Sequence, residues 1–224
     1  LEAVSGYKNI FADTNEEAVQ LTTQTLEWNP NNVHALLSRA IANDRLGKHD
    51  LFLQDVRRIL EVDPSNFTAE QLAIRAHAFA STAQPDRALE DASRCIRRNP
   101  NVAHAYVVGA IVSEQKKDVP SLLQFTTRAI ELDPQNAYAY RLRAHGHWLQ
   151  GEIEAGIQDA TSALQWESHP YAHFVRAILH YSSKQFDRAF EDLGYAIRMS
   201  PWSGHYWGRR ALWECLRGNF QKAI

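Results

Sequence analysis

Prolines recur along this chain at a nearly constant interval. They stand at residues 30, 64, 100, 134 and 201, so the successive intervals are 34, 36, 34 and 67 residues, the last close to twice the first. A small residue follows several of them by ten positions, as Ala40 follows Pro30 and Ala144 follows Pro134. An interval of this length, held along the chain, indicates one structural unit that has been copied end to end.

The segments between these prolines have the composition of α-helices. They are rich in Ala, Leu, Arg, Glu and Gln, which lose little conformational freedom in a helix, and no β-type alternation persists in them. A proline ends a helix because it lacks an N–H donor and pushes the preceding residue out of the helical region. We therefore expect an all-α protein in which each recurring proline closes a pair of helices, while Pro85 and Pro120 lie where second helices begin.

The positions of small and large residues resemble those of the tetratricopeptide-repeat family. When the proline is counted as position 32, residues 170–203 place Ala177 at position 8, Phe186 at 17, Ala189 at 20 and Ala196 at 27, as the family's motif does. The resemblance implies a right-handed α-solenoid of stacked antiparallel helix hairpins. It covers residues 1–224 as a single solenoid, with repeats at 1–32, 33–66, 69–102, 103–136, 137–169, 170–203 and 204–224.

Some positions depart from the motif or invite a specific expectation. Phe52 and Leu122 replace the small residue at position 20, so their hairpins should be splayed or repacked. Trp28 and Trp166 at position 30, and Trp207 at position 4, are expected in the core. Cys95, in place of the usual alanine at position 27, is expected there too, whereas Cys215 should lie on the binding face described below.

Two charged columns of the repeats change together. Position 7 is Arg and position 23 is Asp in four repeats, which gives the pairs Arg39 and Asp55, Arg75 and Asp91, Arg143 and Asp159, and Arg176 and Asp192. Repeats with Ser5 or Gly109 at position 7 have Leu21 or Phe125 at position 23 instead. These positions are nearly symmetric about the turn, so we expect four bidentate ion pairs that set the register of the two helices.

The family resemblance also implies a binding face. In the first helix of each repeat, positions 4, 8 and 11 should pack inside, and positions 2, 5, 9, 12 and 13 fall on the opposite face, which lines a concave groove in tetratricopeptide proteins. The expected groove residues are Leu37, Ile41, Asp44, His77, Val107, Ile111, Glu114, Arg141, His145, Trp148, Phe174, Ile178 and Tyr181.

This apolar, aromatic and histidine-rich stripe should be wet in a free monomer, and such a surface usually marks an interaction site. We expect it to accept an extended or helical apolar peptide, centred on Arg141, His145, Trp148, Phe174, Ile178 and Tyr181. The alternative is that a capping helix or another copy of the chain covers it. Chaperone-binding members of the family grip a C-terminal carboxylate with Lys at position 5 and Asn at position 9, and no repeat here has that pair.

The sequence offers little that predicts catalysis. The ten histidines include no HExxH motif, and there is no GxSxG motif and no glycine-rich phosphate loop. The two cysteines are too few for a disulfide framework or a four-cysteine zinc site. We expect no catalytic residues, no metal site and no cofactor, and therefore no enzyme activity in this chain.

The partner is expected to be a protein or peptide. A net charge of −2 gives no electrostatic reason to expect nucleic acid, and no apolar run approaches the length of a membrane-spanning helix, so we expect neither nucleic-acid binding nor membrane insertion. The leading hypothesis is a cytoplasmic interaction scaffold or adaptor. Because residue 1 lies inside a repeat and residue 224 ends within another, we expect the native protein to extend further. The alternatives are the regulatory or targeting arm of an enzyme, and a self-associating assembly subunit or homo-oligomer.

Overall fold

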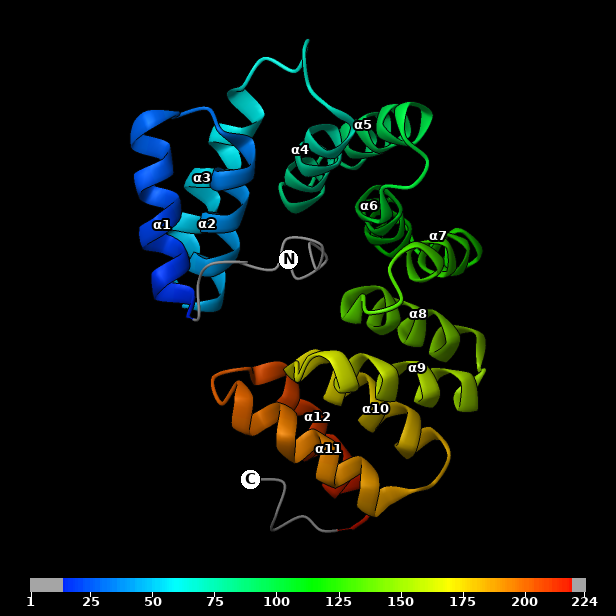
Figure 1. Cartoon of the computed structure of the whole chain (residues 1–224). Coiled ribbons are helices and arrows are strands. Elements are labelled where there is room, and N and C mark those ends of the chain that lie inside the picture. Colours follow the sequence, from blue (N-terminus) through cyan, green and yellow to red (C-terminus); the bar gives the residue numbers. More distant parts are fainter. Residues whose placement is uncertain (1–13, 219–224) are drawn as a thin grey trace. The chain divides into compact units, whose positions relative to one another are not determined.

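The computed structural model describes residues 14–218, except for the side chains of Asp44 and Arg45. The regular secondary structure of these residues is entirely helical. The all-α prediction is confirmed for this part of the chain (Figure 1). The helices are α1 (Asn15–Trp28), α2 (Val33–Arg45), α3 (His49–Glu61), α4 (Ala69–Ser81), α5 (Pro85–Arg98), α6 (Ala103–Gln115), α7 (Val119–Leu132), α8 (Ala137–Gln150), α9 (Ile153–Trp166), α10 (Pro170–Ser182), α11 (Phe186–Met199) and α12 (Gly204–Leu216).

Successive helices pair as hairpins. Helix α2 packs on α3, α4 on α5, α6 on α7, α8 on α9 and α10 on α11, and each pair lies within one predicted repeat (Figure 1). Pro85 is the first residue of α5 and Pro120 the second residue of α7, as expected for second helices. The chain divides after Gln135 into two compact units, with α1–α7 in the first and α8–α12 in the second. That all repeats form one continuous solenoid stays a prediction.

The turn after each first helix has the same backbone conformation. Position 15 has a positive φ in every repeat with a described turn: 72° at Gly47, 56° at Ala83, 58° at Lys117, 78° at Gly151, 62° at Lys184 and 76° at Gly218. At Gly151 the left-handed residue lets the N–H of Glu152 reach the carbonyl oxygen of His147 at 2.9 Å, which ends the helix. Only glycine adopts this conformation without strain, yet three of the six turns use alanine or lysine.

Small residues allow the two helices of a hairpin to approach closely. The alanines at position 8 are fully buried in all five described pairs: Ala40, Ala76, Ala110, Ala144 and Ala177. Cys95 is also fully buried, as predicted, and burial raises the pKa of its thiol to about 12. The large residues at position 20 are accommodated inside, with Phe52 exposed by 4% and Leu122 by 0%, so these hairpins are repacked and still closed.

All four Arg–Asp pairs expected from the sequence are present as side-chain contacts. In each pair the arginine Nε donates to Oδ2 and Nη2 donates to Oδ1 of the aspartate, with distances of 2.6–2.8 Å. The four aspartates are exposed by only 2–7%. A bidentate pair that is shielded from water fixes the relative position of two helices far better than an exposed pair does.

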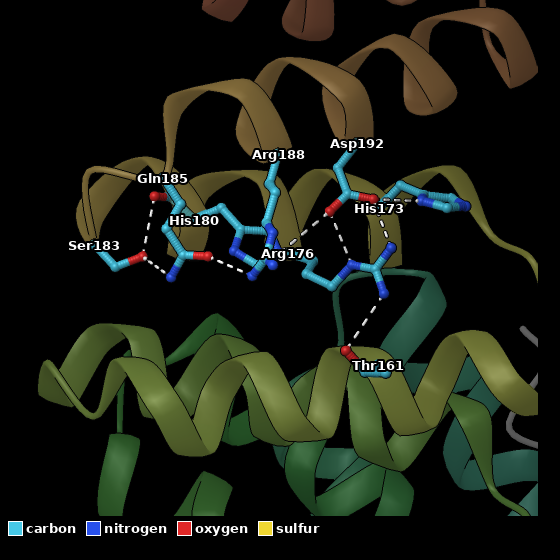
Figure 2. Close-up of polar contacts among 8 residues, drawn as sticks. All are labelled: Thr161, His173, Arg176, His180, Ser183, Gln185, Arg188 and Asp192. Carbon is cyan, nitrogen blue, oxygen red and sulfur yellow. Dashed lines mark hydrogen bonds and ion pairs between the residues drawn. The ribbon is translucent and has the colours of Figure 1, made fainter.

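Two of these arginines also reach the preceding hairpin. Arg176 Nη1 donates to Thr161 Oγ1 on α9 at 3.3 Å, while Nε and Nη2 hold Asp192 on α11 (Figure 2). Arg39 Nη1 donates in the same way to Thr23 Oγ1 on α1 at 3.2 Å. Each guanidinium therefore joins its own hairpin to the one before it.

Asp192 has two histidine neighbours as well as Arg176. His173 Nδ1 lies 3.0 Å from Oδ1, and His180 Nε2 lies 3.8 Å from Oδ2 (Figure 2). Burial raises the pKa of Asp192, but the hydrogen bonds from His173 and Arg176 outweigh it and leave the pKa below its usual value. Burial lowers the pKa of His180, and Asp192 offsets this only in part.

The α6–α7 hairpin has no ion pair at these positions. Gly109 takes the place of the arginine and Phe125 that of the aspartate, and a Cβ atom on Gly109 would lie 3.0 Å from the phenylalanine ring. The two positions thus meet across this hairpin too, through a ring packed against a helix backbone. Ser5, the other residue at position 7 that is not arginine, lies outside the described residues.

The expectation that three tryptophans are core residues is wrong. Trp28 is exposed by 91%, Trp166 by 49% and Trp207 by 47%. Trp28 and Trp166 are the last residues of α1 and α9, where a helix end leaves room for the side chain to turn outward. The indole N–H of Trp207 donates to the carbonyl oxygen of Pro201 at 2.8 Å, which holds that ring beside the preceding loop.

Candidate protein-interaction surface

Most of the predicted groove residues are buried, which corrects the expectation of a wet stripe. Leu37, His77, Val107, Ile111, Arg141, Phe174 and Ile178 are each exposed by 9% or less. The reason is that first helices of neighbouring hairpins contact each other, α2 with α4, α4 with α6 and α8 with α10. Side chains at positions 5 and 9 therefore lie between two helices, where an isolated hairpin would leave them in water.

Some of the predicted groove residues remain accessible to solvent. Ile41, Glu114, His145, Trp148 and Tyr181 are partly exposed, and all five lie at position 9 or 12 of a first helix. The side chain of Asp44, also at position 12, lies outside the described part of the structure.

In the first unit, the stripe contains a stacked pair of histidines. The ring centroids of His77 on α4 and His104 on α6 are 5.1 Å apart and the planes differ by 16°. Burial, reinforced by His104, lowers the pKa of His77 well below its usual value. Both rings are buried, with His77 exposed by 3% and His104 by 9%, so this part of the stripe is a packed interior that offers a partner little surface.

The second unit has an array of rings on its first helices, which we call the second-unit ring cluster. Its members are Tyr138, His145, Trp148, Tyr171, Phe174, Tyr181, His205, Tyr206 and Trp213. Tyr181 on α10 stacks on Trp213 on α12 with centroids 4.1 Å apart and planes within 8°. On α8, His145 stacks on Trp148 at 5.5 Å and meets the edge of Tyr171 at 6.3 Å.

Phe174 lies at the centre of the cluster. It is exposed by 3%, and its ring centroid is 4.7 Å from that of His205 and 5.0 Å from that of Tyr206. Stacked rings favour fixed relative orientations, and the partly exposed Trp148 and Tyr181 each stack on a second ring, that of His145 and that of Trp213. The cluster thus presents preorganised aromatic surface along α8, α10 and α12.

Arg141 is the one arginine in the predicted groove, and it enters this cluster from α8. Its side chain is largely buried, and Nη1 lies 2.7 Å from His169 Nδ1. That nitrogen also accepts the backbone N–H of Tyr171 at 3.1 Å, so it carries no proton and His169 is a neutral partner. The guanidinium carbon is 4.2 Å from the ring centroid of Tyr138 and 5.4 Å from that of Tyr171.

The structure brings all six central residues of the predicted site, from Arg141 to Tyr181, onto two adjacent helices, α8 and α10. Sequence reasoning missed Tyr206 and Trp213, which fall at positions 3 and 10 of α12 and are exposed by 8% and 3%. Four rings within the thirteen residues of α12 were the available signal.

No group of three or more His, Cys, Asp or Glu side chains is placed to hold a metal ion within residues 14–218. None of the described helices combines the length and the apolar character that crossing a bilayer requires.

Comparison with solved structures places the fold among tetratricopeptide-repeat proteins. A crystal structure of the hetero-tetramer Cut9–Hcn1 of the APC/C matches with a TM-score of 0.75 at 13% identity, over 94% of this chain and 42% of that one. A thermophilic tetratricopeptide protein of Thermus thermophilus matches with a TM-score of 0.60 at 20% identity, over 85% of this chain and 98% of that one. The resemblance seen in the sequence is confirmed at the level of the fold.

Two further comparisons bear on the chain. YrrB, described as a tetratricopeptide protein with an unusual peptide-binding site, matches with a TM-score of 0.52 at 15% identity, over 83% of this chain and 95% of that one. Bacteriophage adsorption protein A of Escherichia coli strain K12 is 34% identical over 70 residues, which is 31% of this chain and 7% of that protein. No protein-family model matches the sequence.

Proposed function

We propose that this chain is a protein-interaction scaffold that binds a segment of a partner protein on the second-unit ring cluster. The observation that carries the proposal is the pair Trp148 and Tyr181, two partly exposed rings on neighbouring first helices, each of which stacks on a second ring. Aromatic side chains with low conformational freedom are the residues that dominate binding energy in protein interfaces. The proposed contact residues are His145, Trp148 and Tyr181, which are partly exposed; Arg141, Phe174 and Ile178 of the predicted set are buried in the unbound chain.

The comparisons support the class of function without naming a partner. Cut9–Hcn1 is a complex between proteins, and YrrB is described as having a peptide-binding site. The segment shared with the bacteriophage adsorption protein is 70 residues long and covers 7% of that protein, so the function of that protein is not transferred to this chain. Binding of a protein segment is the function that these comparisons favour for this chain, because repeat stacks of this kind offer extended surfaces.

The proposal is tested by selecting binders from a library of displayed linear peptides against the folded chain. Dissociation constants of the recovered peptides are then measured by fluorescence anisotropy for the native chain and for the double variant Trp148→Ala/Tyr181→Ala. We expect the double variant to weaken binding at least about hundredfold, since two hot-spot rings are each worth about 2 kcal/mol or more.

A matched control removes one Trp and one Tyr elsewhere in the same unit. Trp166 and Tyr195 lie on the second helices α9 and α11 and are exposed by 49% and 43%. The variant Trp166→Ala/Tyr195→Ala should bind as the native chain does. Recovery of no binders, or equal binding by both double variants, contradicts the proposal. If the native chain has twice the monomer mass in solution and the variant Trp148→Ala/Tyr181→Ala has the monomer mass, the cluster is a self-association surface instead.

A further inference from the structure

Arg141 carries a buried charge, and within residues 14–218 no carboxylate forms an ion pair with it. Its side chain is exposed by 7%, and Nε has no hydrogen-bond acceptor. Among the described residues its hydrogen-bond partner is the neutral ring of His169. Two residues along the same helix, Arg143 has the opposite situation, because Asp159 accepts from its Nε and Nη2 at 2.7 and 2.8 Å.

The contacts of Arg141 compensate its charge only in part. The faces of Tyr138 and Tyr171, at 4.2 and 5.4 Å, provide a modest cation–π attraction. Removing an ion from water costs more free energy than this attraction returns, even after the protein relaxes around the ion. A counter-ion that arrives with a ligand would offset much of the desolvation free energy that the tyrosine contacts leave uncompensated.

The atom of Arg141 without an acceptor, Nε, belongs to the edge of the guanidinium that binds carboxylates elsewhere in this chain. In the four structural pairs, Nε and Nη2 hold the aspartate, and in two of them Nη1 is turned to a neutral acceptor, a threonine hydroxyl. In Arg141, Nη1 is turned to the neutral acceptor His169, and the buried Nε has no hydrogen-bond acceptor among the described residues. The arrangement matches an Arg–Asp pair from which the aspartate is missing.

The surrounding helices favour an anion. Neither α8 nor α10 contains an Asp or Glu residue, and the one acidic residue of α12, Glu214, is exposed by 6%. A second cation is close, since the guanidinium carbon of Arg209 lies 6.0 Å from the ring centroid of Phe174. An approaching carboxylate would therefore meet aromatic rings, cations and histidines.

We propose that the segment bound by the second-unit ring cluster carries an Asp or Glu side chain whose carboxylate pairs with Arg141, next to large apolar side chains that contact Trp148 and Tyr181. This inference rests on the proposed function and makes Arg141 a specificity-determining residue. The cation is fixed by His169 and by two tyrosines before the ligand arrives, so little side-chain entropy is lost on binding. The source is a side chain within the segment, because the ring cluster continues from α8 across α10 to α12.

The test uses the full chain and three pools of fluorescein-labelled 12-residue peptides with amidated C-termini. The pools share randomised aromatic and aliphatic flanks and differ at one central position, which is Glu, Gln or Lys. We expect the Glu pool to bind at least about tenfold more tightly than the Gln pool, which corresponds to about 1.4 kcal/mol, and the Lys pool to bind most weakly. In Arg141→Met the ratio between the Glu and Gln pools should fall to about one. In Arg128→Met, which removes an exposed arginine from α7, the ratio should stay as in the native chain.

The outcomes separate this inference from the function on which it rests. Tight binding of all three pools with no preference for Glu overturns the role of Arg141 and leaves the peptide-binding function intact, whereas failure of every pool to bind overturns both. If a Gln pool with a free C-terminal carboxylate binds more tightly than the amidated Glu pool, the carboxylate that pairs with Arg141 comes from a chain end. The proposal that it comes from an Asp or Glu side chain is then wrong.

A second measurement checks that Arg141→Met reports a missing ligand contact and not a disrupted fold. Replacing an unpaired buried charge by an apolar side chain of similar length should leave thermal stability unchanged or raised, whereas Arg143→Met should lower it because Asp159 loses its partner. Lower stability for Arg141→Met than for Arg143→Met would show that Arg141 is a structural residue and contradict the proposal.

Discussion

The ring of Phe125 packs against the backbone of Gly109, in the same place where the other described hairpins with an arginine at position 7 have an ion pair. A Cβ atom at Gly109 would lie 3.0 Å from three carbon atoms of this ring. The α6–α7 hairpin thus keeps the contact between positions 7 and 23 and changes its chemistry. Two columns that covary in the sequence therefore report one contact across the hairpin.

Replacing Gly109 by Ala should destabilise the chain by about 1–3 kcal/mol, because the added methyl group overpacks the interface with Phe125. The measurement is the free energy of unfolding in urea. Gly208→Ala is the control, since nothing lies within 4 Å of the Cβ that it adds on α12. That variant should gain about 0.5–1 kcal/mol from helix propensity. A gain of similar size at Gly109 would show that the ring is free to move.

Asp91→Ala should be among the most damaging single substitutions, with a loss of about 3–5 kcal/mol, because Arg75 would remain buried without its counter-ion. The side chain of Asp91 is exposed by 3% and that of Arg75 by 11%. Lys116 and Asp86 form a matched surface pair at 2.9 Å, with side chains exposed by 46% and 90%. Thermal unfolding should show a loss of only about 0–1 kcal/mol for Asp86→Ala. Equal losses at the two sites would remove burial as the reason for the difference.

Lys184→Gly should stabilise the chain by about 1 kcal/mol, because Lys184 has a φ of 62°, in a region that costs residues with a β-carbon about 1–2 kcal/mol. Gly151→Ala, at the equivalent turn with a φ of 78°, should lose a similar amount. Lys184→Ala keeps the β-carbon and serves as the control, so it should leave the unfolding midpoint nearly unchanged. A midpoint that rises as much for alanine as for glycine would assign the effect to the lysine side chain.

Acid should destabilise the fold below about pH 6.5, the usual pKa of histidine. Burial lowers the pKa of His34, His77 and His180 in the folded chain, so the unfolded chain binds protons more readily. The stability contributed by the neutral rings is complete above pH 6.5 and is lost as the pH falls from there towards the lower folded-state pKa values. His77→Phe keeps a ring against His104, and urea unfolding at pH 7.5 and 5.0 should show a smaller loss for this variant. Substitution of the exposed His49 by Phe is the control, and a pH dependence equal in both variants would contradict the assignment.

The repeat pattern predicts the parts of the fold that depend on one hairpin. Proline spacing, position 8 alanines and the Arg–Asp columns depend on contacts between helices about sixteen residues apart, so a single repeat contains all their information. Pro85 and Cys95 have the places that this pattern gives them.

The burial of the groove is different, because it depends on how neighbouring hairpins approach. Leu37 and Phe174 are enclosed by first helices of adjacent repeats. The distance between those helices cannot be predicted from the periodicity of one helix. A position count alone predicts Trp28 and Trp166 in the core, but a side chain at a helix end can turn outward with little backbone change. The lack of a hydrogen-bond acceptor for Arg141 Nε among the described residues is likewise visible only when its neighbours are in place.

The bonds from Arg39 to Thr23 and from Arg176 to Thr161 have a consequence for local opening of the chain. When α1 or α9 separates from the next hairpin, the arginine there loses a bond while still holding its aspartate. Amide protons of α1 and α2 should then exchange with solvent at related rates, and those of α9 and α10 likewise, so that the smallest block to open is larger than one repeat.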